Sequence, residues 1–234
     1  MTPHPVVGHE AWLAARRTLL AKEKELTHMR DQLSEQRRAL AWERVERAYE
    51  LVGPDGRVAL AELFQGKSQL VVYHFMYGPA PEQQPCKSCS FWADNFERIT
   101  VHLAHRDVRL IAVSRAPLAK LQAFARRMQW TFPWYSSGDS GFNQDFAVSF
   151  EQDQVAPEQM VYNFGTSRAY GSEMPGVSVF YRDDAGAVFH TYSCYARGID
   201  ALNVAYQYLD LVPKGRDEAP PSQPMAWLRL RDEY

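Results

Sequence analysis

Long hydrophobic runs, a basic amino terminus and an excess of charge of one sign are all missing from this sequence. Its 26 basic and 28 acidic residues give a formal net charge of -2. They are interspersed, so no basic face for nucleic acid or anionic lipid is expected. No segment approaches the ~18 uninterrupted apolar residues of a membrane span, and Met1 to Gly8 do not resemble a signal peptide. We therefore expect a cytoplasmic protein with no nucleic-acid or membrane partner.

Cysteine is also scarce. The three cysteines, Cys86, Cys89 and Cys194, are too few for the dense disulfide framework of a small secreted domain. Two of them form a C-x-x-C pair, and in a reducing compartment such a pair is more often redox-active or metal-binding than structural. An apolar content of 46% in 234 residues is ample for one sizeable core. We expect one domain with additional segments attached to it.

The two ends of the chain differ in composition from its middle. Residues 1–50 are predicted to form a helical extension, because residues 9–41 contain neither Gly nor Pro and are rich in helix formers. An apolar stripe with a spacing of seven runs along this helix at Trp12, Leu19, Leu26, Leu33 and Leu40. The stripe must pack either on its own domain or on a second copy of the chain, and the second alternative is a homodimer. Residues 213–234, with four prolines, are predicted to be an extended tail.

Residues 51–212 alternate short apolar runs with amphipathic stretches. Leu70 to Tyr77 and Val108 to Val113 are predicted to be buried strands. Ser88 to His105 and Pro117 to Trp130 are predicted to be helices. Strands separated by helices imply right-handed crossovers and a parallel sheet, so the fold class is α/β.

The second half of this region is less regular. Thr131 to Met174 are interpreted as long loops with one short helix near Phe142 to Phe146. Val177 to Arg182 and Ala187 to Ser193 flank a turn and predict a hairpin, and Gly198 to Leu211 predict a last helix. The whole order is that of a thioredoxin-like fold, with a central mixed sheet of four or five strands flanked by helices.

The C-x-x-C pair is the strongest candidate for chemistry. Cys86 follows a predicted strand and begins a predicted helix, where unsatisfied N–H groups and the helix dipole favour a thiolate. Cys89 lies one turn further on, which suits a resolving partner that releases a mixed disulfide. Pro175 precedes an apolar strand. The resemblance to thioredoxin-like proteins implies that this proline is cis and faces the two cysteines.

Several segments carry a closer resemblance. They are LVVYHFMYGP (70–79), CSFWADNF (89–96), AVSRAPLAKLQAFARRMQW (112–130), FPWYSS (132–137), FNQDF (142–146), PGVSVF (175–180), HTYS (190–193) and YARG (195–198). With them the chain resembles the bacterial thioredoxin-like proteins catalogued as domain-of-unknown-function family eight-nine-nine, distant relatives of the AhpC/TSA peroxiredoxins. The resemblance covers most of the chain and implies a thioredoxin-like fold, but it does not name a substrate.

Two departures from related patterns bear on the reaction. The family commonly has a proline after the first cysteine, whereas here Pro85 precedes Cys86 and Lys87 follows it. Lys87 is either a solvated charge or a cation that favours the thiolate. A peroxiredoxin would have a hydroxyl residue where this chain has Gln83, so the group that would hold a peroxide is missing.

Other residues are candidates for the surroundings of Cys86. His74 lies in the preceding strand and is either a base or orienting group near Cys86, or a buried histidine satisfied by the backbone. Asp94 and Arg115 belong to family-like segments. They either line the same cleft as Cys86 or have a surface or capping role. Trp92 and Trp134 belong to an aromatic set that either covers the core or forms an apolar wall for substrate.

Metal binding is the competing use of the cysteines. Cys86, Cys89, Cys194 and His190 would supply three thiolates and one imidazole, and His190 and Cys194 share one face of a predicted strand. The family usually lacks a cysteine at position 194, and a structural zinc site normally uses two close ligand pairs. The site we predict therefore contains no metal.

The leading hypothesis is a thiol–disulfide oxidoreductase that needs no bound cofactor, because its electrons reside in the cysteine pair. Its partner would be a thiol or disulfide substrate, including a protein substrate. The alternatives are a peroxiredoxin-like hydroperoxide reductase that uses the same cysteine, and a non-catalytic binding protein on the same scaffold.

Overall fold

The structure is a computed structural model that describes residues 4–150, 160–218 and 224–234. The chain forms two compact units, residues 1–41 and 42–234. The first contains one helix, α1 (His9–Arg38), which has no buried residue. The predicted stripe on α1 is exposed, with about half of the Trp12 and Leu19 surfaces accessible (54% and 55%). No helix in the described residues combines the length and the apolar character needed to cross a bilayer.

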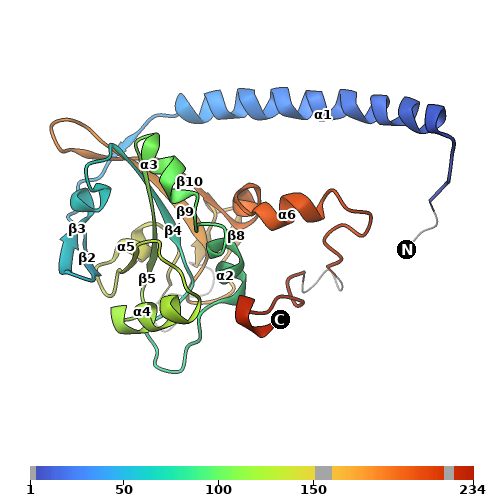
Figure 1. Cartoon of the computed structure of the whole chain (residues 1–234). Helices are drawn as coiled ribbons and strands as arrows, with labels where there is room; N and C mark the ends of the chain where they lie inside the picture. Colours follow the sequence, from blue (N-terminus) through green and yellow to red (C-terminus); the bar gives the residue numbers. More distant parts are fainter. Residues whose placement is uncertain (1–3, 151–159, 219–223) are drawn as a thin grey trace. The chain divides into compact units, whose positions relative to one another are not determined.

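The second unit is built on an eight-stranded sheet in the order β1-β10-β9-β4-β5-β6-β2-β3 (Figure 1). Its strands are β1 (Glu43–Arg44), β2 (Glu50–Gly53), β3 (Gly56–Ala59), β4 (Gln69–His74), β5 (Val108–Ser114), β6 (Trp134–Ser136), β9 (Gly176–Arg182) and β10 (Val188–Tyr195). A separate pair of short strands is formed by β7 (Val161–Tyr162) and β8 (Ser167–Arg168).

The centre of the sheet has the thioredoxin-like arrangement. β4 pairs in parallel with β5, from Gln69 opposite Val108 to His74 opposite Val113. On its other side β4 pairs antiparallel with β9, and β9 pairs antiparallel with β10. A parallel strand–helix–strand unit followed by an antiparallel hairpin gives a central mixed sheet flanked by helices. The predicted fold class is confirmed, but the sheet has eight strands in place of the four or five predicted, because β1, β2 and β3 from the amino-terminal part of the chain extend both of its edges.

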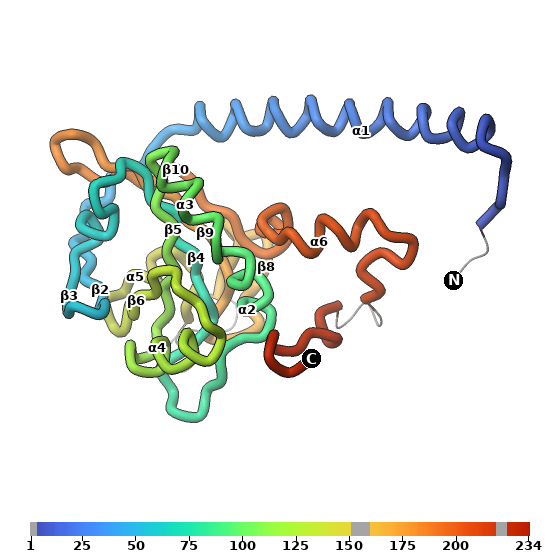
Figure 2. The backbone as a smooth tube through the Cα atoms, viewed as in Figure 1, coloured from blue at the N-terminus to red at the C-terminus, as the bar shows by residue number. Residues whose placement is uncertain are grey.

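Helices cover the two faces of the sheet unequally. Tyr73 packs on the face covered by α2 (Lys87–Ala93), α3 (Thr100–His105), α4 (Leu118–Arg127) and α6 (Val204–Leu209). Leu70 and Val72 pack on the other face, against α5 (Phe142–Asp145) and the short 3-10 helix η1 (Leu60–Phe64). Side chains alternate between faces along a strand, so neighbouring residues of β4 belong to different cores. Figure 2 traces β4 and β5 between these layers.

Two predicted helices are interrupted. The segment predicted as one helix from Ser88 to His105 is split into α2 and α3, and Arg98 between them has a left-handed φ of 71°, which no α-helix tolerates. The segment from Gly198 to Leu211 starts inside the 3-10 helix η3 (Ala196–Leu202), and α6 follows. The break lies at Asn203, whose side chain accepts a hydrogen bond from the Tyr206 N–H at 3.2 Å, as an N-cap does.

The irregular segments contain more structure than predicted. The predicted loop region Thr131 to Met174 includes β6, the expected short helix α5, β7 and β8; its residues 151–159 lie outside the described part. Of the predicted tail, residues 219–223 are also outside it. The described end is packed: Leu228 and Leu230 are buried, and the chain finishes in the short 3-10 helix η4 (Arg231–Glu233).

Candidate active site

Cys86 is the residue at which the chain turns into α2. Its own N–H donates to the carbonyl oxygen of Met76 at 3.2 Å, which ties the start of α2 to the end of the β4 segment. Its backbone is extended (φ -68°, ψ 124°), and its Sγ accepts the Cys89 N–H at 3.4 Å. The Cys86 side chain is therefore the N-cap of α2, as the sequence position predicts.

The two cysteines have opposite environments. Cys86 is partly exposed, whereas Cys89 is buried. The pKa of Cys86 is lowered to about 7, chiefly by a hydrogen bond from the Cys89 thiol and, against the opposing effect of burial, by the N–H groups of Cys89 and Ser88. Burial raises the pKa of Cys89 well above its usual range, with the neighbouring Cys86 adding to the effect. Such a pair has one thiol ready to ionise and one that holds its proton.

A cavity of about 210 Å³ adjoins the pair on the Cys89 side. Its walls include Tyr73, Met76, Trp92, Pro175, Ile199 and Met225. The walls are mostly apolar, and the volume is below the roughly 300–1,000 Å³ of a pocket for a drug-sized ligand. The cavity can therefore hold a small apolar group next to the sulfur of Cys89.

Pro175 and Trp92 both line this cavity. The Pro175 carbonyl accepts a hydrogen bond from the Tyr162 hydroxyl, which in turn accepts the Ala196 N–H at 2.8 Å. Trp92 is fixed by its indole N–H, which donates to the Ile199 carbonyl at 2.9 Å. The cis form of the bond before Pro175 stays a prediction.

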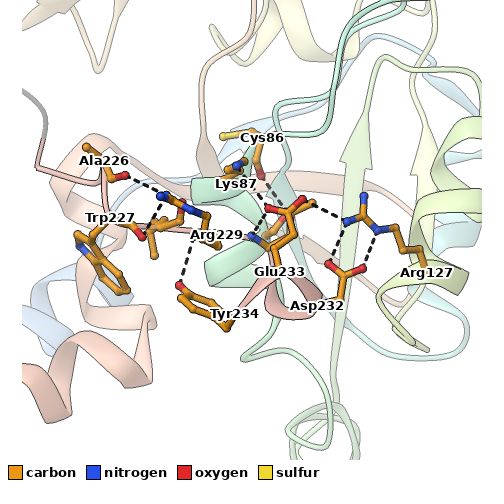
Figure 3. Close-up of polar contacts among 12 residues, drawn as sticks. Cys86, Lys87, Arg127, Ala226, Trp227, Arg229, Asp232, Glu233 and Tyr234 are labelled. Atoms are coloured by element: carbon orange, nitrogen blue, oxygen red, sulfur yellow. Dashed lines mark hydrogen bonds and ion pairs between the residues drawn. The ribbon is translucent and has the colours of Figure 1, made fainter.

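Lys87 is the first residue of α2, and Asp94 directly follows this helix. Both form ion pairs with residues 231–233 near the carboxyl end. The Lys87 ammonium group pairs with Glu233 at 3.4 Å, and Figure 3 shows Glu233 lying between Lys87 and Arg127. Asp94 accepts the Trp130 indole N–H at 2.8 Å and pairs with Arg231 at 3.5 Å. Burial raises the pKa of the Asp94 carboxyl. Neither residue lines the cavity.

Arg115 and Trp134 lie away from the cavity wall. The Arg115 guanidinium is buried and faces the buried carboxylate of Glu173 at 3.5 Å. The Trp134 indole N–H donates to the Ser114 hydroxyl at 3.0 Å, inside the aromatic core. Both side chains are therefore part of the protein interior and do not contact the cavity.

His74 is on the opposite face of the sheet from the thiols. Its ring packs against Phe142 and Phe146 of the second core, and its Nε2 lies 2.9 Å from the Ser178 hydroxyl. Burial, together with His190, lowers the pKa of the imidazole to about 3, so the ring is neutral at physiological pH. Of the two interpretations of His74, the observed ring corresponds to the buried histidine, with the Ser178 hydroxyl as its partner in place of a backbone carbonyl.

The residues proposed as alternative metal ligands have other partners. The His190 Nε2 lies 2.7 Å from the Ser193 hydroxyl, and Cys194 is partly buried. Within residues 4–150, 160–218 and 224–234, no three His, Cys, Asp or Glu side chains gather into a metal-binding cluster.

Sequence reasoning missed two parts of the site. Tyr73 lines the cavity beside Cys89, but the continuous apolar run around it hides which residues face the thiols. Residues 213–234 were predicted to be an extended tail, with no role at the site. Instead, Leu230 packs into the core that includes Cys89, and Arg127 holds Asp232 through two hydrogen bonds of 2.7 and 3.0 Å (Figure 3). The sequence signal for this packing was the presence of two leucines, Leu228 and Leu230, after the last proline of the segment.

The lowered pKa of Cys86 predicts the pH dependence of its alkylation. The thiolate is the reactive form, so the rate with iodoacetamide should rise with pH through a midpoint near 7, the pKa to which the site lowers this thiol. Cys89 should remain unmodified in the same range. Mass spectrometry of quenched samples at several pH values measures both rates, and a Cys86 midpoint near that of an ordinary thiol would contradict the assignment.

The chain is similar to several solved structures and matches one protein family. Similar solved structures include peroxidoxin BcpB from Mycobacterium tuberculosis (16% identity, TM-score 0.46, 72% of this chain and 97% of that one). They also include peroxiredoxin Q from Xanthomonas campestris (16%, 0.48, 72% and 97%) and a yeast mitochondrial 1-Cys peroxiredoxin (15%, 0.43, 73% and 78%). A search of curated proteins found no match. The family described as "Bacterial protein of unknown function (DUF899)" matches residues 1–234, which confirms the predicted resemblance, and the chain belongs to this family.

Proposed function

We propose that this protein is a thiol–disulfide oxidoreductase in which Cys86 attacks and Cys89 resolves. The observation that carries the proposal is the asymmetry of the pair. The Cys86 sulfur is partly exposed and its pKa is lowered to about 7. Cys89 is buried with a raised pKa. At neutral pH the first is partly a thiolate, and the second keeps its proton until the second step.

The reaction would proceed in two exchanges. The Cys86 thiolate attacks one sulfur of a substrate disulfide, forms a mixed disulfide and expels the other substrate sulfur as a thiolate. Cys89 then attacks the Cys86 sulfur and releases the second substrate thiol. The substrate gains two electrons, and the pair is left as the Cys86–Cys89 disulfide. The separation of three residues, with the Cys89 N–H already on the Cys86 sulfur at 3.4 Å, supports this order.

The cavity beside Cys89 suggests where the substrate lies. Its apolar walls would receive a small apolar group of a thiol or disulfide, including a side chain of a protein substrate. Pro175 forms part of this wall, and its carbonyl is already engaged by Tyr162. We therefore assign Pro175 a role in shaping the entrance.

No bound organic cofactor or metal is needed for this chemistry, because both electrons move between sulfur atoms. A dithiol that must be regenerated after each turnover suits a reducing compartment such as the cytoplasm. We propose that location on the same ground.

Mixed-disulfide trapping tests the proposal. A Cys89→Ser variant expressed in cells should retain substrates covalently on Cys86, and reduction with dithiothreitol should release them for identification by mass spectrometry. Cys194→Ser is the matched control and should trap nothing. A Cys89→Ser variant that traps nothing contradicts the proposal; if the wild-type protein then consumed hydroperoxides, the peroxiredoxin-like alternative would replace it.

A further inference from the structure

Tyr73 has an unusual hydroxyl group. Its side chain is 1% exposed and belongs to the core that contains Cys89. Among the described residues, no partner forms a hydrogen bond of acceptable geometry with this hydroxyl. A buried hydroxyl without a partner destabilises a folded protein, and native structures contain few of them. This arrangement is explained if the hydroxyl finds its partner in another chemical state of the site.

Cys89 is the neighbour that changes its state. Tyr73 and Cys89 line the same cavity, and after burial the largest effect on the Tyr73 pKa comes from Cys89. The Cys89 Sγ already accepts the Met76 N–H at 3.4 Å. A thiol is a weak acceptor, whereas an ionised sulfur forms stronger, charge-assisted hydrogen bonds. The Tyr73 hydroxyl is close enough to Cys89 for a side-chain hydrogen bond between them to raise the pKa of Tyr73 and to oppose the rise in that of Cys89. The Met76 N–H and the Tyr73 hydroxyl therefore flank an atom that must become negative during the reaction.

We propose that Tyr73 donates a hydrogen bond to the Cys89 thiolate while that thiolate attacks the mixed disulfide on Cys86. This inference rests on the proposed function. Cys89 gives its proton to the substrate thiolate expelled in the first exchange. Its sulfur then bonds to the Cys86 sulfur, the bond between Cys86 and the substrate breaks, and the departing sulfur takes the electron pair and a proton from water. Tyr73 keeps its own proton, because burial raises its pKa well above the usual range.

Other titratable groups also face this part of the site. They are Cys86 on α2, Tyr162 on β7, Tyr170, and the Arg197–Asp200 ion pair of η3. Burial raises the pKa of Tyr162 above its usual range and that of Tyr170 to about 12. None of the tyrosines is therefore expected to ionise between pH 6 and 9, and a change in the pH profile of the second exchange reports on the cysteines.

Stopped-flow mixing with dithiobis-nitrobenzoate separates the two exchanges in a Cys194→Ser background. The first thionitrobenzoate released reports attack by Cys86, and the second reports attack by Cys89. Tyr73→Phe should leave the first rate within about twofold. It should slow the second by roughly 10- to 100-fold near neutral pH, the effect of one hydrogen bond to a charged group. The pH midpoint of the second exchange should rise by about one to two units.

Tyr195→Phe is the matched control. Tyr195 is also buried (5% exposed), but its hydroxyl donates to the Phe146 carbonyl at 3.0 Å. This control should lower Tm and leave both exchanges unchanged, whereas Tyr73→Phe should leave Tm unchanged or raise it. A Tyr73→Phe variant with the wild-type second rate and midpoint overturns the inference, and so does an equal slowing of both exchanges. A wild-type protein without a second release refutes the proposed function itself.

Discussion

Replacing Cys86 with serine is expected to abolish disulfide reduction. A serine hydroxyl does not ionise near neutral pH, so the nucleophile that the site prepares by lowering the Cys86 pKa to about 7 is lost. The rate should fall by about 10³-fold or more, as expected when the nucleophile of a catalytic unit is removed. Reduction of a chromogenic disulfide by the dithiothreitol-recycled protein measures the loss. Circular dichroism should show an unchanged fold, because the two side chains are nearly isosteric.

Cys194→Ser is the control for this experiment. Cys194 is also partly buried and packs at the edge of the same core, so its replacement tests whether any cysteine change reduces activity. We expect activity close to that of the wild type. Full activity in Cys86→Ser would leave the scaffold as a binding protein without this chemistry.

Removing the charge of Arg115 is expected to have the largest effect on stability. Arg115 faces Glu173, and both side chains are buried, 10% and 3% exposed. Deleting one partner of a buried ion pair strands the other charge and costs about 3–5 kcal/mol. Arg115→Ala should lower the free energy of unfolding in urea by that amount near pH 8. Arg127→Ala, which removes exposed ion pairs to Asp232 and Glu233, should cost no more than about 1 kcal/mol.

The size of the Arg115 effect should depend on pH. Burial raises the pKa of Glu173 to about 7, although Ser149 and Arg115 oppose the shift. Without Arg115 the folded-state pKa rises further. A carboxyl group with a raised folded-state pKa destabilises the fold as pH increases from the unfolded-state value toward the folded-state one. The loss in Arg115→Ala should therefore be smaller at pH 5 than at pH 8. Equal losses at both pH values would show that Glu173 is not the stranded group.

Local signals in the sequence were sufficient for the centre of the fold. The buried strand Val108 to Val113 and the hairpin around residues 183–186 matched β5, β9 and β10, because apolar runs and turn residues act over a few positions. The sequence also predicted correctly that a helix begins at Cys86. Arg98 and Asn203 broke two predicted helices, and these breaks depend on a left-handed turn and a side-chain cap that periodicity does not reveal.

The surroundings of the cysteines were harder to predict. Tyr73 and His74 are adjacent in an uninterrupted apolar run, and a strand buried on both faces carries no alternation to show which face holds the thiols. The sequence left open whether His74 lies near Cys86 or is only a buried histidine. The structure places Tyr73 on the face of the thiols and His74 on the other face. The pairing of Lys87 with Glu233 joins residues far apart in the chain, and exposed ion pairs leave no pattern in a single sequence.

The packing of Leu230 and Glu233 near the cysteines has a consequence for synthesis on the ribosome. Leu230 belongs to the core around Cys89, and Glu233 is paired with the residue that follows Cys86. During translation the two cysteines leave the exit tunnel long before these residues are made. The nascent domain therefore carries α2 incompletely covered, and the surroundings of the two cysteines are complete only after residues 230–233 emerge. Oxidants or folding factors met in that interval would act on thiols that the finished protein partly shields.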